Sequence, residues 1–285
     1  MVGRGRRNPP LQQIAYALLD LSLLGGWVAR WSYRLGFHGK LSVTKHELQL
    51  LKRGYQPPRP LVLAFASDLH GGPTTHPDLF AALLDELIAH RPDVLLLGGD
   101  YVWSKSEQIE VLANVLSKCD PPLGKFGVLG NHDLWTDDAH IMRALQEAGV
   151  EILVNENRHL PAPFDGISIC AIDDPWTGTA DVAKAFEGAR SIRVFLTHSP
   201  DGLLLLKGHQ FDIALAGHTH GGQVALRDGT QILTAGGPLA RSYGRGRFEI
   251  AGQGTLIVSR GVGCSNIPVR INSDPELVIC TLLPG

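Results

Sequence analysis

From residue 61 onward the chain repeats one hydrophobic pattern: a short, nearly continuous apolar run, a small residue, and then Asp, Asn or His. Apolar runs of this length are typical of strands that are buried on both faces. The pattern therefore predicts strands over residues 61–67, 93–99, 126–130, 191–197 and 212–217.

Amphipathic segments lie between several of these runs and predict helices, because their apolar residues recur at helical spacing. These segments are 77–91, 106–118, 137–149 and 179–189. A further strand is expected over 41–51, followed by a proline-rich turn at 55–60. Strand and helix alternate, which predicts an α/β fold.

The polar residues that follow the strands are all of types that bind metal ions. In chain order they are Asp68, His70, Asp100, Asn131, His132, Asp133, His198, His218 and His220. A single Asp in such a place is more often a helix cap than a ligand. Ligands of open α/β sheets, however, bind beyond the carboxyl ends of the strands. Polar residues at five such ends predict one shared metal site.

Composition allows a sizeable core and gives no sign of a nucleic-acid surface. The 285 residues are 44% hydrophobic and 19% charged, with a formal net charge of −2. The cysteines are scattered, without a C-x-x-C pair, so we expect reduced thiols rather than a disulfide framework or a zinc knuckle. They are Cys119, Cys170, Cys264 and Cys280.

The N-terminus differs from the rest of the chain. Residues 1–10 are basic, and 11–31 are apolar enough and long enough to reach across a bilayer as one helix. Asp20, near the middle, would cost about 2.5–3.5 kcal/mol on insertion. Three interpretations stay open: a transmembrane signal anchor, a helix in the membrane interface, and a soluble helix packed on the following domain.

Five motifs, in this order, resemble those of the calcineurin-like metallophosphoesterases: SDLHGG (67–72), GGD (98–100), GNHD (130–133), TH (197–198) and GHTHGGQ (217–223). The tail, from YGRGRFEI (243–250) to PELVICTL (275–282), resembles the compact bacterial branch of that family with an N-terminal membrane segment. That branch includes general phosphodiesterases and UDP-2,3-diacylglucosamine pyrophosphohydrolases. The resemblance implies a four-layer α/β/β/α sandwich, with an N-terminal apolar helix in front of it.

The resemblance also implies a dinuclear metal site. The ligands of one metal ion would be Asp68, His70 and His220. The ligands of the other would be Asn131, His198 and His218. Asp100 would bridge the two ions, and His132 would be the catalytic histidine beside the phosphate. Asp133 either orients His132 or caps the following helix. Mixed Asp, Asn and His ligands suit Mn, Fe, Zn or Co, with manganese a natural choice for an assay.

The leading hypothesis is a dinuclear-metal-dependent phosphoesterase that hydrolyses a phosphodiester or pyrophosphate bond by attack of a metal-bound hydroxide. One alternative is UDP-2,3-diacylglucosamine pyrophosphohydrolase of lipid A synthesis. An alternative from another class is a non-catalytic metal-binding scaffold, which the complete ligand set disfavours.

We expect residues 1–40 to form a basic, membrane-associating N-terminus and 41–285 to form the catalytic domain. The expected partners are a phosphoester, with nucleotide-linked lipids among the candidates, and the surface of the inner membrane through 11–31. Either side of that membrane stays open, because a spanning helix and a surface helix place the domain on opposite sides. No nucleic acid is expected, and the pattern predicts no oligomeric state.

Overall fold

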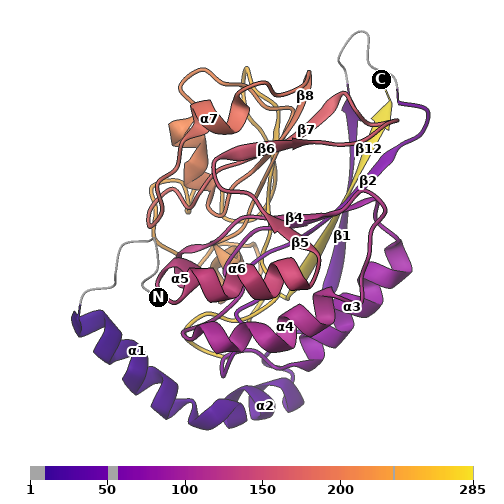
Figure 1. Cartoon of the computed structure of the whole chain (residues 1–285). Coiled ribbons are helices and arrows are strands. Elements are labelled where there is room, and N and C mark those ends of the chain that lie inside the picture. The colour runs from indigo at the N-terminus through magenta and orange to yellow at the C-terminus, as the bar shows by residue number, and fades with distance from the viewer. Residues whose placement is uncertain (1–9, 51–56, 234, 285) are drawn as a thin grey trace.

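Two six-stranded sheets face each other in the computed structural model, which describes residues 10–50, 57–233 and 235–284 (Figure 1). The first sheet has the order β1 (Ser42–Leu50), β12 (Glu276–Pro284), β2 (Leu61–Ala66), β3 (Val94–Leu97), β4 (Lys125–Gly127), β5 (Val150–Ile152). The second has the order β10 (Gly246–Glu249), β11 (Thr255–Val258), β9 (Ile213–Ala216), β8 (Ile192–Leu196), β7 (Ile167–Ala171), β6 (Glu156–His159). The neighbouring strands β2 to β5 are parallel, as are β7, β8, β9 and β11.

Helices cover the outer face of each sheet, which gives the four α/β/β/α layers. The first sheet carries α3 (Asp78–His90), α4 (Ile109–Leu116) and α6 (Asp138–Glu147). The second carries α7 (Val182–Phe186) and the 3₁₀ segment η3 (Pro200–Leu205). From residue 41 onward, all the strands and helices expected from the pattern are present, although 106–118 divides into the 3₁₀ turn η2 (Ser106–Gln108) and α4.

The strand β2 shows how the sequence builds these layers. Leu61, Leu63 and Phe65 belong to the core between the two sheets, whereas Ala64 and Ala66 pack against the helices. Side chains of a strand alternate between its two faces, so large residues fill the space between the sheets and small ones let the helices approach.

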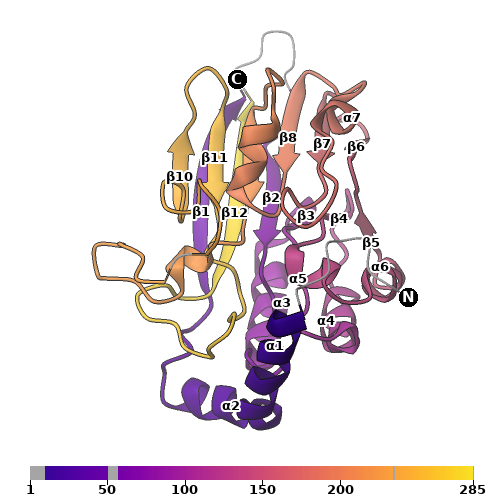
Figure 2. The ribbon, with the colours of Figure 1, turned by 90° about the vertical axis from the view of Figure 1, so that its left-hand side faces the viewer.

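The ends of the strands determine where the site lies. In Figure 2 the arrowheads of β2 and β8 point in the same direction, although the two strands belong to different sheets. The carboxyl ends of β2, β3, β4, β8 and β9 therefore deliver the loops that follow them to one edge of the molecule. Ligand sites of α/β sheets form at this edge.

Residues 11–31 do not form the single helix that the sequence suggested. α1 spans Pro10–Ser22 and α2 spans Trp27–Arg34. Between them Gly25 and Gly26 have φ values of 63° and 87°, a left-handed backbone that glycine adopts at little steric cost. Within the described parts of the chain, no helix has the length and apolar character that crossing a membrane requires.

Both N-terminal helices instead pack on the domain. Asp20 of α1 accepts hydrogen bonds from Trp103 Nε1 (2.9 Å) and from Ser104 Oγ. Tyr33 of α2 stacks on His76 with the ring centroids 4.1 Å apart. Asp20, which would hinder insertion into a bilayer, thus serves as a polar contact to the folded domain.

Candidate metal centre

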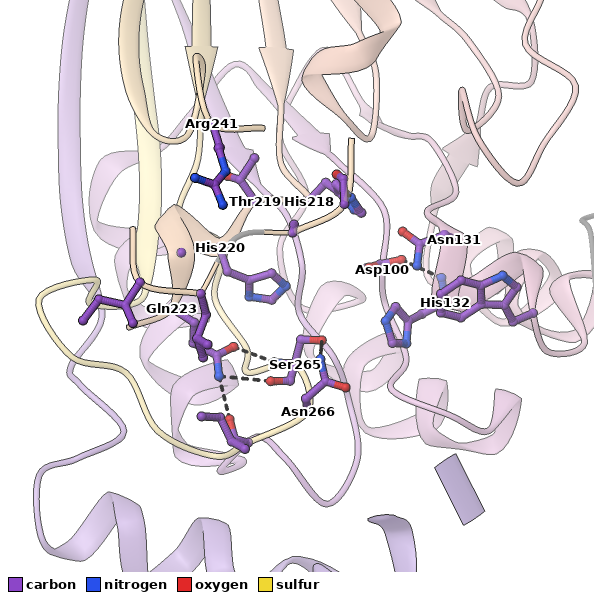
Figure 3. Close-up of a pocket in the computed structure, with 17 residues that line it drawn as sticks. Asp100, Asn131, His132, His218, Thr219, His220, Gln223, Arg241, Ser265 and Asn266 are labelled. Atoms are coloured by element: carbon purple, nitrogen blue, oxygen red, sulfur yellow. Dashed lines mark hydrogen bonds between the residues drawn. The ribbon is translucent and has the colours of Figure 1, made fainter. Parts of the chain in front are cut away.

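The side chains predicted as metal ligands converge at the common edge of the two sheets. Figure 3 shows Asp100, Asn131, His218 and His220 of this set. Three overlapping groups have their ligand atoms within 4.8 Å of one another: Asp68 with His70 and His220; His70 with Asp100 and His132; and Asp100 with His198 and His218. Residues as far apart in the chain as Asp68 and His220 thus meet in one place.

The first group lies around the end of β2. His70 Nε2 and His220 Nε2 are 3.1 Å apart, and His220 Nε2 is 3.5 Å from Asp68 Oδ1. Two imidazole nitrogens and a carboxylate oxygen are all electron-pair donors, so their close approach in a buried space favours a cation between them. This donor set suits a divalent metal ion.

The second cluster of predicted ligands consists of Asn131, His198 and His218. His198 Nε2 is 3.1 Å from Asn131 Oδ1 and 3.2 Å from His218 Nδ1. Asp100 Oδ2 connects this group to the first, because it is 3.5 Å from His198 Nε2 and also 3.5 Å from His70 Nε2. One carboxylate oxygen therefore lies equally near to both groups.

The backbone at these positions is unusual. Five of the residues have positive φ: Asp68 (52°), His70 (43°), Asp100 (54°), His218 (69°) and His220 (52°). The left-handed region is uncommon for residues other than glycine and costs about 1–3 kcal/mol where the surroundings enforce it. Its concentration at one edge is the kind of strain that is found at functional sites.

Glycines beside the ligands allow the loops to come this close. A Cβ on Gly130 would collide with Asp100 Oδ1, and one on Gly217 would collide with Asp68 Oδ2. At these two positions glycine therefore leaves room for the carboxylates themselves.

The pKa values of the buried side chains are shifted in different directions. Burial lowers the pKa of His70 and His220 well below the usual value, and it raises the pKa of Asp68. At Asp100 burial acts to raise the pKa, but His198, His132 and His70 together outweigh it, and the pKa is held well below its usual range. Burial opposes the charged form of His198, yet the Asp100 carboxylate raises its pKa well above 6.5. The neutral imidazoles of His70 and His220 beside the ionised Asp100 carboxylate are suited to holding a cation.

His132 is held in a fixed orientation at the start of α5 (Asn131–Leu134). Its backbone N–H donates to Asp100 Oδ1 at 2.8 Å, and its ring Nδ1 donates to the carbonyl of Trp103 at 2.6 Å. The second bond fixes the tautomer with the proton on Nδ1. Burial lowers the pKa of the His132 ring.

The Asp133 carboxylate accepts hydrogen bonds from backbone N–H groups, while the His132 ring donates to Trp103. Asp133 Oδ2 accepts from the backbone N–H groups of Asp100 (2.8 Å) and Gly130 (2.9 Å), and Oδ1 accepts from those of Tyr101 (2.9 Å) and Val102 (3.2 Å). Its carboxylate therefore joins the loop after β3 to the N-terminus of α5, whereas the following helix α6 is capped by Asp137. Burial and the neighbouring Asp100 raise the pKa of Asp133 to about 8, and the N–H donors oppose that shift.

Two arginines of the tail have different surroundings. Arg270 is buried, and its guanidinium donates to the carbonyls of Gly263 (Nε, 3.0 Å) and Ser273 (2.9 Å), beside His220. It therefore braces the loop around a ligand, a role that no sequence motif suggested. Arg241 lines the cavity that opens onto the metal-binding side chains.

That cavity has a volume of about 560 Å³. Its polar lining includes Asn131, His132, His218, Arg241 and Asn266 (Figure 3). Its apolar lining includes Trp135, Ile232, Leu233, Ala235 and Ile267. A cavity with both polar and apolar side chains in its lining fits a substrate that joins a charged group to a less polar one.

Comparisons with known proteins agree with this geometry. Residues 61–222 match the family model described as "Calcineurin-like phosphoesterase". A protein of Aquifex aeolicus named "Uncharacterized metallophosphoesterase" is 31% identical over 227 residues, which are 76% of this chain and 83% of that protein. "Phosphodiesterase YaeI" of Escherichia coli is 30% identical over 253 residues, 86% of this chain and 89% of that one.

Among solved structures, an archaeal phosphodiesterase aligns with a TM-score of 0.40 and 12% identity, covering 70% of this chain and 82% of the other. That likeness is too distant to support any statement about function. The family match, in contrast, spans all the ligand residues described above. The chain therefore belongs to the calcineurin-like phosphoesterases and is a metal-dependent phosphoric ester hydrolase.

Proposed function

We propose that the protein uses a dinuclear metal centre to hydrolyse a phosphodiester or pyrophosphate bond of an amphiphilic substrate at the inner membrane. The single observation behind the dinuclear centre is the position of Asp100 Oδ2, 3.5 Å from both His70 Nε2 and His198 Nε2. In this proposal Asp100 bridges the two ions. Asp68, His70 and His220 hold one, and Asn131, His198 and His218 hold the other.

Two divalent ions in these places would supply a water molecule of lowered pKa and would neutralise the charge of the phosphate. The chain itself contributes orientation. The backbone N–H of His132 fixes the Asp100 carboxylate, and the ring lines the cavity, where its Nε2 would meet a phosphate or leaving oxygen. Arg241, on the same cavity, would pair with a second anionic group such as the other phosphate of a pyrophosphate.

The membrane part of the proposal rests on exposed apolar side chains at the edge that carries the site. We call this set the apolar rim; it consists of Ile14, Leu18, Leu21, Trp27, Trp31, Ile232, Leu233 and Ile267. The helices α1 and α2 and the loops that carry the others lie at the same end of the molecule (Figure 2). Exposed Arg30 and Arg34 lie on α2 beside the two tryptophans.

Tryptophan, arginine and aliphatic side chains together suit the interface of a bilayer that contains anionic lipids. Residues 1–40 would then rest on the membrane and present the cavity of the 41–285 domain to it. A nucleotide-linked lipid with a pyrophosphate, such as UDP-2,3-diacylglucosamine, is the more specific candidate, because the cavity combines Arg241 with apolar walls.

The first test uses purified, Mn²⁺-loaded protein with bis-p-nitrophenyl phosphate and with UDP-2,3-diacylglucosamine in detergent. Asp100→Ala should abolish metal loading. His132→Ala should retain the metals and lose most turnover, since general acid or electrostatic help from a side chain is worth about 10²–10⁴-fold. The control is His140→Ala, whose ring contacts Glu110 outside the cavity.

Equal metal loss in the Asp100 and His132 variants would contradict these roles. Hydrolysis of the small diester without the lipid would exclude the lipid as substrate. Absence of hydrolysis of any ester, with less than one metal ion per chain, would favour the non-catalytic scaffold.

The membrane part is tested separately by sedimentation with vesicles. Wild-type protein should bind vesicles of phosphatidylcholine with phosphatidylglycerol more strongly than vesicles of phosphatidylcholine alone. The double variant Trp27→Ala, Trp31→Ala should bind less, whereas Ile88→Ala, an exposed apolar residue of α3, should bind normally. A wild-type protein that binds neither kind of vesicle would overturn this part.

A further inference from the structure

We infer that the N-terminal helix α1 forms part of the active site, with Asp20 and Tyr16 as positioning residues for His132. The inference rests on the proposed catalytic role of His132. It adds that the N-terminal helix, which belongs to none of the metal-binding motifs, takes part in turnover.

Asp20 ties α1 to the loop after β3. Its Oδ1 accepts from Trp103 Nε1 at 2.9 Å, and its Oδ2 accepts from Ser104 Oγ at 2.9 Å. Lys105 Nζ lies 3.6 Å from Oδ2, and the Asp20 side chain is only 15% exposed. A carboxylate on a largely apolar helix is thus matched with donors from three consecutive residues, which fixes where α1 sits on the domain.

Trp103 transmits this contact to the catalytic histidine. Its indole is buried and donates to Asp20, while its backbone carbonyl accepts from His132 Nδ1 at 2.6 Å. Its ring also lies against the His132 ring, with centroids 5.0 Å apart and planes inclined by 31°. One residue therefore holds both the helix and the orientation and tautomer of the histidine.

Tyr16 completes an aromatic enclosure around His132. The Tyr16 ring centroid is 5.2 Å from that of Trp103, 5.9 Å from that of His132 and 5.9 Å from that of Trp135. Tyr16 and Asp20 are four residues apart and so share one face of α1. That face adds a wall to the rings already around His132, which restricts the histidine to one rotamer.

α1 has two different faces. Ile14, Leu18 and Leu21, at helical spacing of their own, are exposed, at 56%, 62% and 70%. The inward face therefore carries the one acid of the helix and an aromatic ring, and both contact residues at the site. The polar and aromatic residues of α1 therefore contact the site, and its aliphatic residues face away from the domain.

The experiment compares Asp20→Ala, Asp20→Asn and Ser22→Ala in the full chain, with bis-p-nitrophenyl phosphate as a small soluble substrate. Asp20→Ala should lower kcat at least about tenfold, with KM changed less than about threefold and bound metal unchanged, because a misplaced catalytic group costs up to about 10²-fold. Asp20→Asn keeps an acceptor for Trp103 Nε1 and should recover most of the turnover. Ser22, exposed on the same helix with its hydroxyl bonded to Leu19, is the control.

A merely structural role would give a different result. The melting temperature of Asp20→Ala would then fall, and turnover per folded, metal-loaded chain would stay at the wild-type level. That result, or a loss of metal equal to the loss of turnover, overturns the inference. If His132→Ala itself keeps full turnover, the proposed function fails. If His132→Ala loses turnover and Asp20→Ala does not, only the role of α1 fails.

Discussion

The substitution Asp133→Asn tests how the loops around the site are held together, because it replaces no proposed metal ligand. The wild-type carboxylate accepts four backbone N–H groups, two on each oxygen, at distances between 2.8 and 3.2 Å. An asparagine has one carbonyl oxygen and one amide nitrogen, which is itself a donor. It can therefore satisfy only two of the four N–H groups and faces the other two with hydrogen atoms.

The size of the effect follows from the two orphaned donors. Each buried N–H left without an acceptor costs about 1–3 kcal/mol, so we expect the free energy of unfolding to fall by about 2–6 kcal/mol. Domains are typically stable by about 5–15 kcal/mol, so this is a large share of the total. Because one of the four N–H groups belongs to Asp100, the backbone of the bridging carboxylate should also shift, and bound metal should decrease.

The assay is urea unfolding of the metal-loaded protein, with the metal content of the same samples measured in parallel. Asp181→Asn is the matched control. Asp181 caps α7 by accepting from Lys184 N–H at 3.1 Å, far from the site in the sequence, and Asn caps a helix about as well as Asp. If Asp133→Asn unfolds within about 0.5 kcal/mol of wild type and keeps its metal, the bracing role of this carboxylate is wrong.

Further predictions concern buried groups away from the metal ligands. Lys125 Nζ donates to the carbonyls of Leu116, Cys119 and Ala148 at the ends of α4 and α6, so Lys125→Met should reduce the free energy of unfolding by about 2–4 kcal/mol with kcat unchanged; equal stability in urea would contradict this. Burial lowers the pKa of His38 from 6.5 to about 4. Between these values the unfolded chain binds a proton that the folded chain does not. Stability should therefore fall by up to about 3 kcal/mol as the pH drops from 7 to 4, and His38→Asn should flatten this dependence in urea titrations at pH 7 and 5; an unchanged slope would refute it. Burial also raises the pKa of the thiols, to about 12 for Cys170 and Cys280 and about 11 for Cys264. A thiol reagent at pH 8 should therefore label native protein slowly and unfolded protein rapidly, whereas fast labelling of these thiols in native protein would be inconsistent with their burial.

The sequence predicted the strands that end in Asp, Asn or His and the clustering of these polar side chains, because both depend on local patterns. An apolar run that ends in Asp, Asn or His, repeated five times, determines the strands and places the polar residues at their carboxyl ends. Parallel strands then bring those ends to one edge without any further information. The pattern missed polar strands such as β6, whose residues Glu156–His159 carry no apolar alternation. It also missed the apolar strands β7 and β12.

The roles of individual side chains were harder to predict from the sequence. Asp133 looked like a partner for its neighbour His132, but its oxygens accept from backbone N–H groups up to 33 positions earlier. Arg270 belongs to none of the five motifs, and it is buried beside His220. In both cases the side chain holds backbone groups of the loops around the site, and no motif records such contacts.

The N-terminal segment shows most clearly what the sequence determines and what only the tertiary structure decides. Its sequence determined an apolar, helix-forming stretch with one acid and left three environments open. Only the tertiary structure decided that Gly25 and Gly26 break the stretch and that Asp20 meets Trp103, 83 positions away. The spacing of apolar residues shows which face of a helix can be buried, because residues three or four positions apart lie on the same face. Which surface the segment then covers depends on the closure of long loops and on the shape of the folded domain, and these exist only when the whole chain has folded.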